Sequence, residues 1–226
     1  MCTRFYIDIS DKEMQDIVNA AANSALAHRF MVAGDPMSKP GEIYPTNVVP
    51  VIASSRSGHR SVFPMKWGYA LKGGGRTGRT VSTLLNARSE TAGSKPTFRD
   101  SWKSHRCIVP ASYYFEWEHA GGNAVDQSHN GNATDQDHGN NTIKQKYAIQ
   151  PKGRAITWLC GLYRIEDGFP HFVVLTRPPS EDIAFIHDRM PLILPAERID
   201  DWIDPAVDAE DLVHYALSDM VFEKAV

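Results

Sequence analysis

Hydrophobic residues near the start of the chain recur every three or four positions, which is the spacing of one face of an α-helix. The residues in this pattern are Met14, Ile17, Val18, Ala21, Ala22, Ala25 and Leu26. Ser10 and Glu13 form an S-x-x-E capping box, a common start of a helix. The pattern therefore predicts an amphipathic helix over residues 11–30.

Most of the remaining chain consists of short segments rich in aromatic and β-branched residues. We interpret these segments as strands at residues 3–7, 47–54, 61–70, 106–119, 146–151, 155–164 and 171–176. In the fourth segment the side chains alternate, with Tyr113, Phe115 and Trp117 on one face and Tyr114, Glu116 and Glu118 on the other. Many strands and few helices predict a single α+β domain over residues 1–226, with a mixed, curled (barrel-like) β-sheet and a few flanking helices.

Residues 119–143 differ in composition, because they are mostly Asn, Gly, Asp, Gln and His with few apolar groups. Such a segment cannot bury enough apolar surface to order itself, so we expect a disordered surface insertion between two strands. Its three histidines lack a ligand-like spacing, and no metal site is expected there.

The overall composition, 42% hydrophobic and 23% charged, is typical of a soluble globular protein. There is no run of about 18 apolar residues, which a membrane-spanning helix needs. Asp8, Asp11 and Glu13 interrupt the start of the chain, unlike the apolar region of a signal peptide. We therefore expect a cytoplasmic protein with no membrane contact.

Positive charge is concentrated in residues 56–106, which hold eleven Lys and Arg against two acids, Glu90 and Asp100. A basic segment in an otherwise balanced chain indicates a polyanionic partner, although an ordinary solvated surface explains it equally well.

The chain has three cysteines, an odd number with wide spacing, which argues against a disulfide framework and against a zinc site. Cys107 and Cys160 lie in apolar, strand-like segments, where buried and inert thiols are expected. Cys2 is different because only Met1 precedes it. Cysteine is small enough for an initiator methionine to be removed in front of it, which would leave an α-amine and a thiol on adjacent carbons.

Four separated segments together resemble the SRAP family, the SOS response-associated peptidases that repair or shield abasic sites. They are Cys2 to Phe5, Asn86 to Thr91, Phe115 to Trp117 and His187 to Pro191. Asn47 to Pro50 and Trp67 to Tyr69 match weaker family signatures. The resemblance covers nearly the whole chain and implies an abasic-site sensor that forms a covalent crosslink with single-stranded DNA through Cys2, once Met1 is removed.

The chemistry of an exposed amino-terminal cysteine agrees with that resemblance. A ring-opened abasic site is an aldehyde, and an unprotonated amine attacks it to give an imine. At pH 7 about 10–15% of an α-amine is unprotonated, against about 0.04% of a lysine. The neighbouring thiol can then close a five-membered thiazolidine, and this closure gains a large effective molarity because it is intramolecular.

Three further residues are catalytic candidates beside Cys2. Glu116 is a candidate general acid and base, and the alternative is a solvated charge on a strand. His187 could protonate the sugar oxygen, or could be structural. Asn86 could bind the sugar or hold the thiol, and could as easily cap a turn. We expect Asp188 and Arg189 to form a structural ion pair.

The resemblance also suggests residues that would contact DNA. Arg4 and Arg88 are suited to phosphate contacts, and Trp117 and Pro50 to stacking on bases. The remaining candidates for DNA contact are Asn47, Thr176 and Trp67. For Trp67 the alternative is a position in the core. The basic segment would line a groove for the single strand.

The resemblance implies an enzyme, with crosslinking as its main activity, lyase activity as a possible competitor, and peptidase activity limited to Met1 or to crosslink release. We expect no cofactor, a monomer, and single-stranded DNA containing abasic sites as the partner. Two alternatives remain: a hydrolase or amidotransferase with an amino-terminal cysteine nucleophile, and a non-catalytic single-stranded DNA-binding module.

Overall fold

A closed five-stranded barrel forms one half of the molecule. The computed structural model describes residues 2–71, 82–118 and 144–225. The barrel strands, in order around the barrel, are β11 (Thr157–Glu166), β8 (Arg106–Ala111), β3 (Val48–Ser54), β4 (Arg60–Trp67) and β12 (Phe169–Arg177), and β12 pairs with β11 to close it. The β4–β12 pairing is parallel and the others are antiparallel. The predicted α+β fold with a mixed, barrel-like sheet is therefore confirmed.

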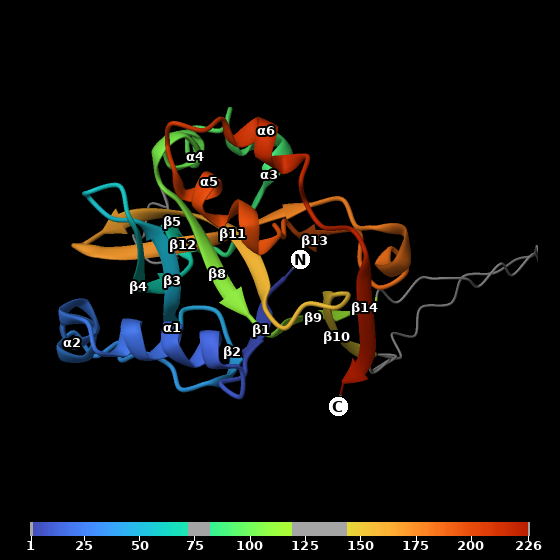
Figure 1. Ribbon diagram of the computed structural model, residues 1–226, viewed down its shortest axis with the longest axis horizontal. Coiled ribbons are helices and arrows are strands. Elements are labelled where there is room, and N and C mark those ends of the chain that lie inside the picture. The colour runs from blue at the N-terminus through green and yellow to red at the C-terminus, as the bar shows by residue number, and fades with distance from the viewer. Residues whose placement is uncertain (1, 72–81, 119–143, 226) are drawn as a thin grey trace, which may run out of the picture.

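An antiparallel sheet of five strands forms the other half (Figure 1). Its order is β14 (Met220–Ala225), β10 (Lys146–Pro151), β9 (Tyr113–Trp117), β1 (Arg4–Ile7) and β2 (Gly41–Ile43). Two short strands, β7 (Asn86–Arg88) and β13 (Met190–Pro191), add to β12 of the barrel. A separate hairpin pairs β5 (Tyr69–Leu71) with β6 (Ser82–Leu84).

The two halves share one extended segment, which the sequence predicts as a single strand over residues 106–119. The segment divides at Ser112, with β8 in the barrel and β9 in the five-stranded sheet. The Ser112 amide donates to the Tyr6 carbonyl at 2.8 Å, and the Ser112 carbonyl accepts from Thr157 Oγ1 at 3.0 Å. Ser112 is thus bonded to both halves, and this bend brings β9 to the side of the barrel.

Short helices cover the remaining surfaces (Figure 1). They are α1 (Lys12–Ala22), α2 (Ala25–Val32), α3 (Ser89–Ala92), α4 (Arg99–Ser104), α5 (Ile199–Ile203) and α6 (Ala209–Val213), with 3₁₀ turns η1 (Glu181–Ile183) and η2 (Ala196–Arg198). In Figure 1, α1 and α2 lie below the barrel and α3 to α6 lie above it. None of the helices in the described ranges is long and apolar enough to cross a membrane.

The helix predicted over residues 11–30 is two helices. Asp11, not Ser10, caps the first, accepting from the Met14 amide at 3.0 Å. The chain leaves the helix at Asn23, and Ser24 caps the second by accepting from the Ala27 amide at 3.1 Å. The apolar spacing continues through this break, so periodicity alone did not reveal it, whereas a serine side chain that bonds the backbone favours a helix start.

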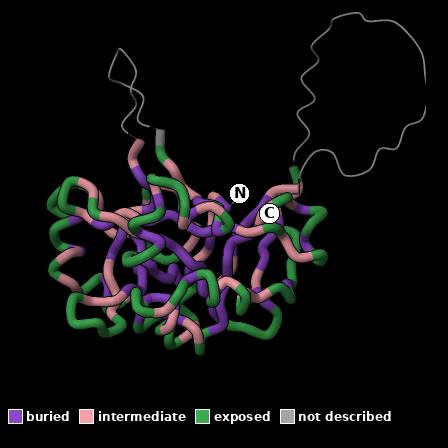
Figure 2. The backbone as a smooth tube through the Cα atoms, turned by 90° about the horizontal axis from the view of Figure 1, so that it is seen from above, coloured by how far each residue is buried: buried purple, intermediate pink, exposed green. Residues whose placement is uncertain are grey.

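The hydrophobic core runs through both halves without interruption (Figure 2). Its largest fully buried side chains include Trp67, Trp202, Tyr69, Tyr114 and Phe5. The amino-terminal strand carries Cys2 and Phe5 into this core. Cys2, the first residue that the structure describes, therefore lies in the interior. The predicted insertion at 119–143 falls outside the described residues.

Candidate active site

The fold brings the four catalytic candidates to the junction between the two halves. Cys2 precedes β1 and Glu116 lies on β9, the strand that pairs with β1. Asn86 begins β7, which pairs with β12 of the barrel. His187 lies in the segment between η1 and β13, and β13 also pairs with β12. Residues from both ends of the chain thus meet at one place.

Cys2 is fully buried, and it is held by a neighbouring side chain. Asn86 Nδ2 donates to the Cys2 carbonyl at 2.9 Å. The Cys2 thiol lies 3.6 Å from the Arg4 carbonyl and donates to it. Burial, with a smaller contribution from the nearby negative charge of Glu116, raises the pKa of the Cys2 thiol well above its usual range. At neutral pH this sulfur is therefore a protonated thiol.

Glu116 is also buried, with 3% of its surface exposed. It lies on the interior face of β9 together with Tyr114, so it is not the solvated charge that the sequence left open. Burial raises the pKa of Glu116 to about 7, and Asp188 acts in the same direction, while the positive amino terminus opposes both. Because the carboxyl is close to half ionised at neutral pH, it can both accept and donate a proton.

His187 faces Glu116, with 4.0 Å between His187 Nε2 and Glu116 Oε2. Its other ring nitrogen, Nδ1, accepts from the Arg189 amide at 3.0 Å and lies 2.7 Å from Asp188 Oδ1. In the neutral ring, the acceptor role of Nδ1 leaves the proton on Nε2, which lies 4.0 Å from Glu116 Oε2. When the ring is protonated, Nδ1–H can donate to Asp188 instead. Both states of this histidine have a partner.

An ion pair that the sequence did not predict joins two of the motif segments. Arg189 donates to both carboxylate oxygens of Glu90, at 2.5 and 2.8 Å, and to the Thr176 carbonyl at 2.6 Å. The hydrogen bonds from Arg189 lower the pKa of Glu90 to about 2. The expected pairing of Asp188 with Arg189 is therefore wrong: Asp188 pairs with His187. The signal available in the sequence was the pair of opposite charges, Glu90 in one motif and Arg189 in the other.

Of the candidate DNA contacts, Arg4 and Trp117 lie together beside the site. The Arg4 guanidinium lies 4.3 Å from the ring centre of Tyr44 and 5.4 Å from that of Trp117. It also donates to Glu42 at 3.0 Å, so its charge is partly neutralised. Arg88, at the end of β7, is exposed. The Asn47 side chain accepts from the Tyr44 amide at 2.9 Å, which organises the turn that carries Tyr44.

Three other candidate contacts are buried in the structure. Trp67 is fully buried, with its indole N–H donating to the Leu85 carbonyl at 3.1 Å. Thr176 is fully buried on β12, and Pro50 is buried on β3 of the barrel. None of these three side chains presents an exposed surface to DNA in this structure. The core position that the sequence left open for Trp67 is the one observed.

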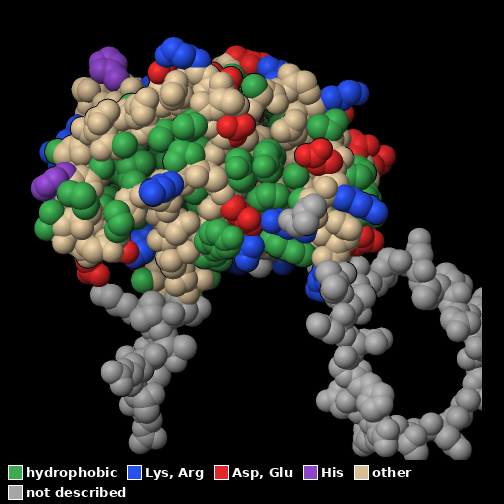
Figure 3. All heavy atoms as spheres, turned by 90° about the horizontal axis from the view of Figure 1, so that it is seen from below, with side chains coloured by type: hydrophobic (Ala, Val, Ile, Leu, Met, Phe, Trp, Pro, Cys, Tyr) green, Lys and Arg blue, Asp and Glu red, His purple; other side chains and the backbone are tan. Residues whose placement is uncertain are grey.

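The basic segment 56–106 does not form one continuous positive surface in the part of the chain that the structure describes. Arg106 is buried and donates to the carbonyls of Trp102 and Trp202. Lys66 pairs with Asp35 at 2.7 Å. Figure 3 shows a face on which Lys and Arg are interspersed with Asp and Glu around central hydrophobic side chains. Lys72, Arg76 and Arg79 lie outside the described residues.

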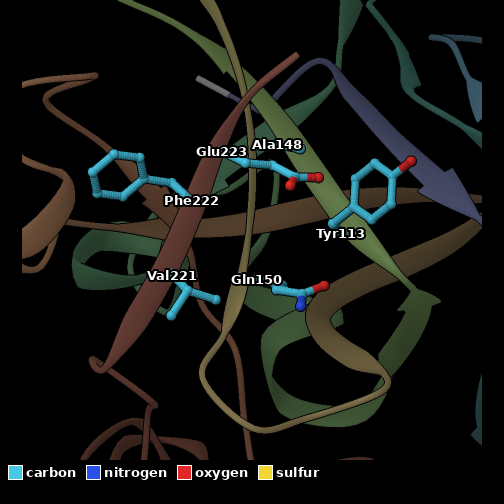
Figure 4. Close-up of a pocket in the computed structure, with 6 residues that line it drawn as sticks. All are labelled: Tyr113, Ala148, Gln150, Val221, Phe222 and Glu223. Carbon is cyan, nitrogen blue, oxygen red and sulfur yellow. The ribbon is translucent and has the colours of Figure 1, made fainter.

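A pocket of about 310 Å³ lies away from these residues, on the other face of the five-stranded sheet (Figure 4). Its lining includes Tyr113, Gln150 and Glu223, from three adjacent strands. It contains none of the four catalytic candidates. Within the described residues no group of His, Cys, Asp and Glu is arranged to hold a metal ion.

Taken as chemistry, the junction combines a sulfur nucleophile, a carboxyl that exchanges protons near neutral pH, an imidazole with a mobile proton, and an amide that fixes the chain at Cys2. Such a set suits a reaction in which a nucleophile adds to a carbonyl carbon and water is lost. It requires no metal ion as an electrophile, because the imidazole and the carboxyl can supply the protons.

Comparison with known proteins gives consistent relatives. The family model described as SOS response associated peptidase (SRAP) matches residues 1–224. The chain is 29% identical over 156 residues to the abasic site processing protein YoaM of Bacillus subtilis, covering 61% of this chain and 60% of that protein. It is 25% identical over 183 residues to the abasic site processing protein YedK of Escherichia coli, covering 77% and 71% respectively.

The alignment therefore spans about 60% of the length of the Bacillus relative. A crystal structure of a protein from Bacteroides thetaiotaomicron matches with a TM-score of 0.68 and 21% identity, over 100% of this chain and 92% of that chain. At this identity the likeness supports the fold alone.

Proposed function

Because the chain belongs to the SOS response associated peptidase family, we propose that it processes abasic sites by forming a thiazolidine crosslink between Cys2 and the DNA. The observation that carries the proposal is the meeting of Cys2, Asn86, Glu116 and His187 at one buried junction. The abasic site processing proteins among its relatives support the same substrate class.

Removal of Met1 is the first requirement, because it converts the amide nitrogen of Cys2 into an amine. The amine attacks first, since the thiol pKa is raised and the sulfur is protonated at neutral pH. A nitrogen–carbon bond forms at the aldehyde carbon, and the carbonyl oxygen takes up a proton. Glu116, with its pKa near 7, accepts the proton that the amine releases.

Loss of water from this carbinolamine gives an iminium ion, and Glu116 or His187 returns the proton that the leaving hydroxyl needs. The Cys2 thiol then gives its proton to the Glu116 carboxylate, and the sulfur bonds to the same carbon. The electron pair of the carbon–nitrogen double bond moves to nitrogen. The products are a thiazolidine and one water molecule, so atoms and charge balance.

Asn86 and His187 have distinct roles in the proposal. Asn86 holds the Cys2 carbonyl at 2.9 Å, which fixes the direction of the terminal amine. His187, whose Nε2 faces the Glu116 carboxyl, protonates the sugar ring oxygen and so favours the open aldehyde. Asn86 thus acts on the residue that carries the amine and His187 on an oxygen bonded to the reacting carbon, and a water-excluding junction strengthens such contacts.

The proposed DNA contacts lie on the surface beside Cys2. Arg88 is exposed and contacts phosphate. Trp117 and Tyr44, which flank Arg4, provide aromatic surfaces for flanking bases. Single-stranded DNA suits this surface because its bases are free to stack. We propose that the protein acts as a monomer and without a cofactor.

The proposal is tested with a single-stranded oligonucleotide that carries one abasic site. Wild type is expected to form an adduct that survives denaturation without a reducing agent. Cys2→Ser keeps an amine and loses the thiol, so its adduct is expected only after borohydride reduction. Cys160→Ala is the matched control, because it removes another fully buried thiol outside the junction.

Two outcomes would contradict the proposal. Equal unreduced adduct from wild type and Cys2→Ser would show that the thiol takes no part. Equal DNA retention by wild type and Cys2→Ala on native gels, with no adduct from either, would favour a non-catalytic DNA-binding module.

A further inference from the structure

Tyr114 places a buried hydroxyl in the interior beside the catalytic candidates. Its side chain is fully buried, and Tyr114 Oη has no hydrogen-bond partner among the residues that the structure describes. An unsatisfied buried hydroxyl is unfavourable, because it has given up its bonds to water and gained none in return. Packing alone does not explain it, since phenylalanine would fill the same space without that penalty.

The fold places this hydroxyl on the same side as the reacting groups. Tyr114 and Glu116 are two residues apart on β9, so they share its interior face. Tyr114 pairs with Phe5 of β1, the strand that follows Cys2. Cys2, Phe5 and Tyr114 are all buried in the hydrophobic core. The charged forms of Cys2 and Glu116 both act on Tyr114 electrostatically.

We propose that the Tyr114 hydroxyl donates a hydrogen bond to the Cys2 sulfur while the thiol closes the thiazolidine ring, which makes Tyr114 a further catalytic residue. The inference rests on the proposed function. Negative charge develops on sulfur as its proton leaves for Glu116, and a neutral donor stabilises that charge. Burial, with Cys2 and Glu116 acting in the same direction, raises the pKa of Tyr114, so its proton is retained at the pH of the reaction.

A hydrogen-bond donor at this position would stabilise a negative charge on the Cys2 sulfur. The Cys2 thiol donates to the Arg4 carbonyl, and the Glu116 carboxyl acts on the sulfur electrostatically. Burial and Glu116 both oppose the thiolate, whereas a backbone hydrogen bond with Arg4 favours it. A hydroxyl donor would stabilise the charge that develops on this sulfur.

The test compares Tyr114→Phe with wild type. Tyr113→Phe is the matched control, because it removes a neighbouring hydroxyl on the opposite face of β9, in the pocket of Figure 4. Tyr114→Phe is expected to slow crosslinking about tenfold at neutral pH, the size of one hydrogen bond. Its thermal midpoint should equal or exceed that of wild type. Tyr113→Phe should crosslink at the wild-type rate.

A second readout needs no DNA. After Met1 removal, the ultraviolet absorbance of the thiolate is followed against pH, with Cys2→Ala as the blank. Tyr114→Phe is expected to move the thiolate transition about one pH unit higher. Tyr114→fluorotyrosine, with a more acidic hydroxyl, should move it lower, and it keeps the test available should the phenylalanine variant fold poorly.

The inference would be overturned if Tyr114→Phe crosslinked at the wild-type rate and left the thiolate transition unmoved. A clear loss of thermal stability in Tyr114→Phe would also overturn it, because the hydroxyl would then have a structural role. Absence of any crosslink with wild type would overturn the proposed function instead, since the thiolate measurement stands apart from DNA.

Discussion

The burial of Glu116 lowers the stability of the folded protein at high pH, and in the proposed reaction it gives the carboxyl a pKa suited to proton transfer. Its carboxyl has 3% of its surface exposed, and burial raises its pKa from 4.5 to about 7. The protonated form is therefore favoured in the folded protein. The stability that this contributes is fully present below pH 4.5 and is lost as the pH rises through 7. Above pH 7 the charged form destabilises the fold on the order of 3 kcal/mol.

Replacing Glu116 by Gln should therefore stabilise the protein and impair the reaction. We expect Glu116→Gln to unfold at a higher denaturant concentration than wild type at pH 8, with the difference shrinking as the pH falls towards 4.5. Its crosslinking rate should fall about a hundredfold or more. Glu118→Gln, just after the end of β9, is the control. Equal unfolding of Glu116→Gln and wild type at both pH values would refute the buried, neutralised carboxyl.

The sequence predicted part of this residue-scale picture. Cys2, Asn86, Glu116 and His187 were all identified by their motifs, and the structure brings them together. The burial of Glu116 was not predictable, because the alternation on β9 does not say which face is inside. For the same reason Tyr114 read as an ordinary aromatic residue. The burial of Pro50, Trp67 and Thr176 was not predictable either, because a motif does not separate interior positions from surface ones.

At the scale of elements, the ion pair between Glu90 and Arg189 connects α3 to the segment that carries His187. Arg189 is largely enclosed, with its side chain 11% exposed, whereas that of Glu90 is 43% exposed. The same arginine binds the Thr176 carbonyl of β12, so three separate pieces of chain meet at its guanidinium. In the proposed reaction, the pair would act through the position of His187.

Glu90→Gln should loosen this connection without touching the reacting groups. We expect a loss of about 1 kcal/mol in the free energy of unfolding at pH 7, since the carboxylate is partly solvated, and a several-fold slower crosslinking rate. Because its pKa is lowered to about 2, Glu90 stabilises the fold above pH 4.5, and this is lost as the pH falls towards 2. Glu210→Gln, on α6, is the control for an exposed acid. Identical rates in all three proteins would contradict the role.

Element boundaries were less predictable than element types. The apolar spacing from Met14 to Leu26 is continuous, yet the helix ends at Ala22 and restarts at Ala25 because of the Ser24 cap. The alternation from Arg106 onward is also continuous, yet Ser112 divides it between two sheets through its bonds to Tyr6 and Thr157. The first break follows a local hydrogen bond and the second follows bonds to distant segments, and hydrophobic patterns record neither kind.

At the scale of the molecule, a closed barrel and an open sheet meet along a shared strand, and the junction holds the candidate site. The barrel explains why the basic segment 56–106 is not one surface, since its strands place Arg106 inside and Lys66 beside Asp35. Closure of the barrel depends on pairings between distant segments, such as the parallel β4–β12 pair. The sequence indicated the fold class but not these partners.

The central claim is that one liberated cysteine forms the bond to DNA with both its nitrogen and its sulfur. The most direct test is the intact mass of the adduct formed with an abasic oligonucleotide, without reduction. We predict the sum of the protein lacking Met1 and the oligonucleotide, less one water molecule, with the attached sugar mapping to Cys2. A covalent adduct that retained Met1, or one attached at a lysine, would contradict the account.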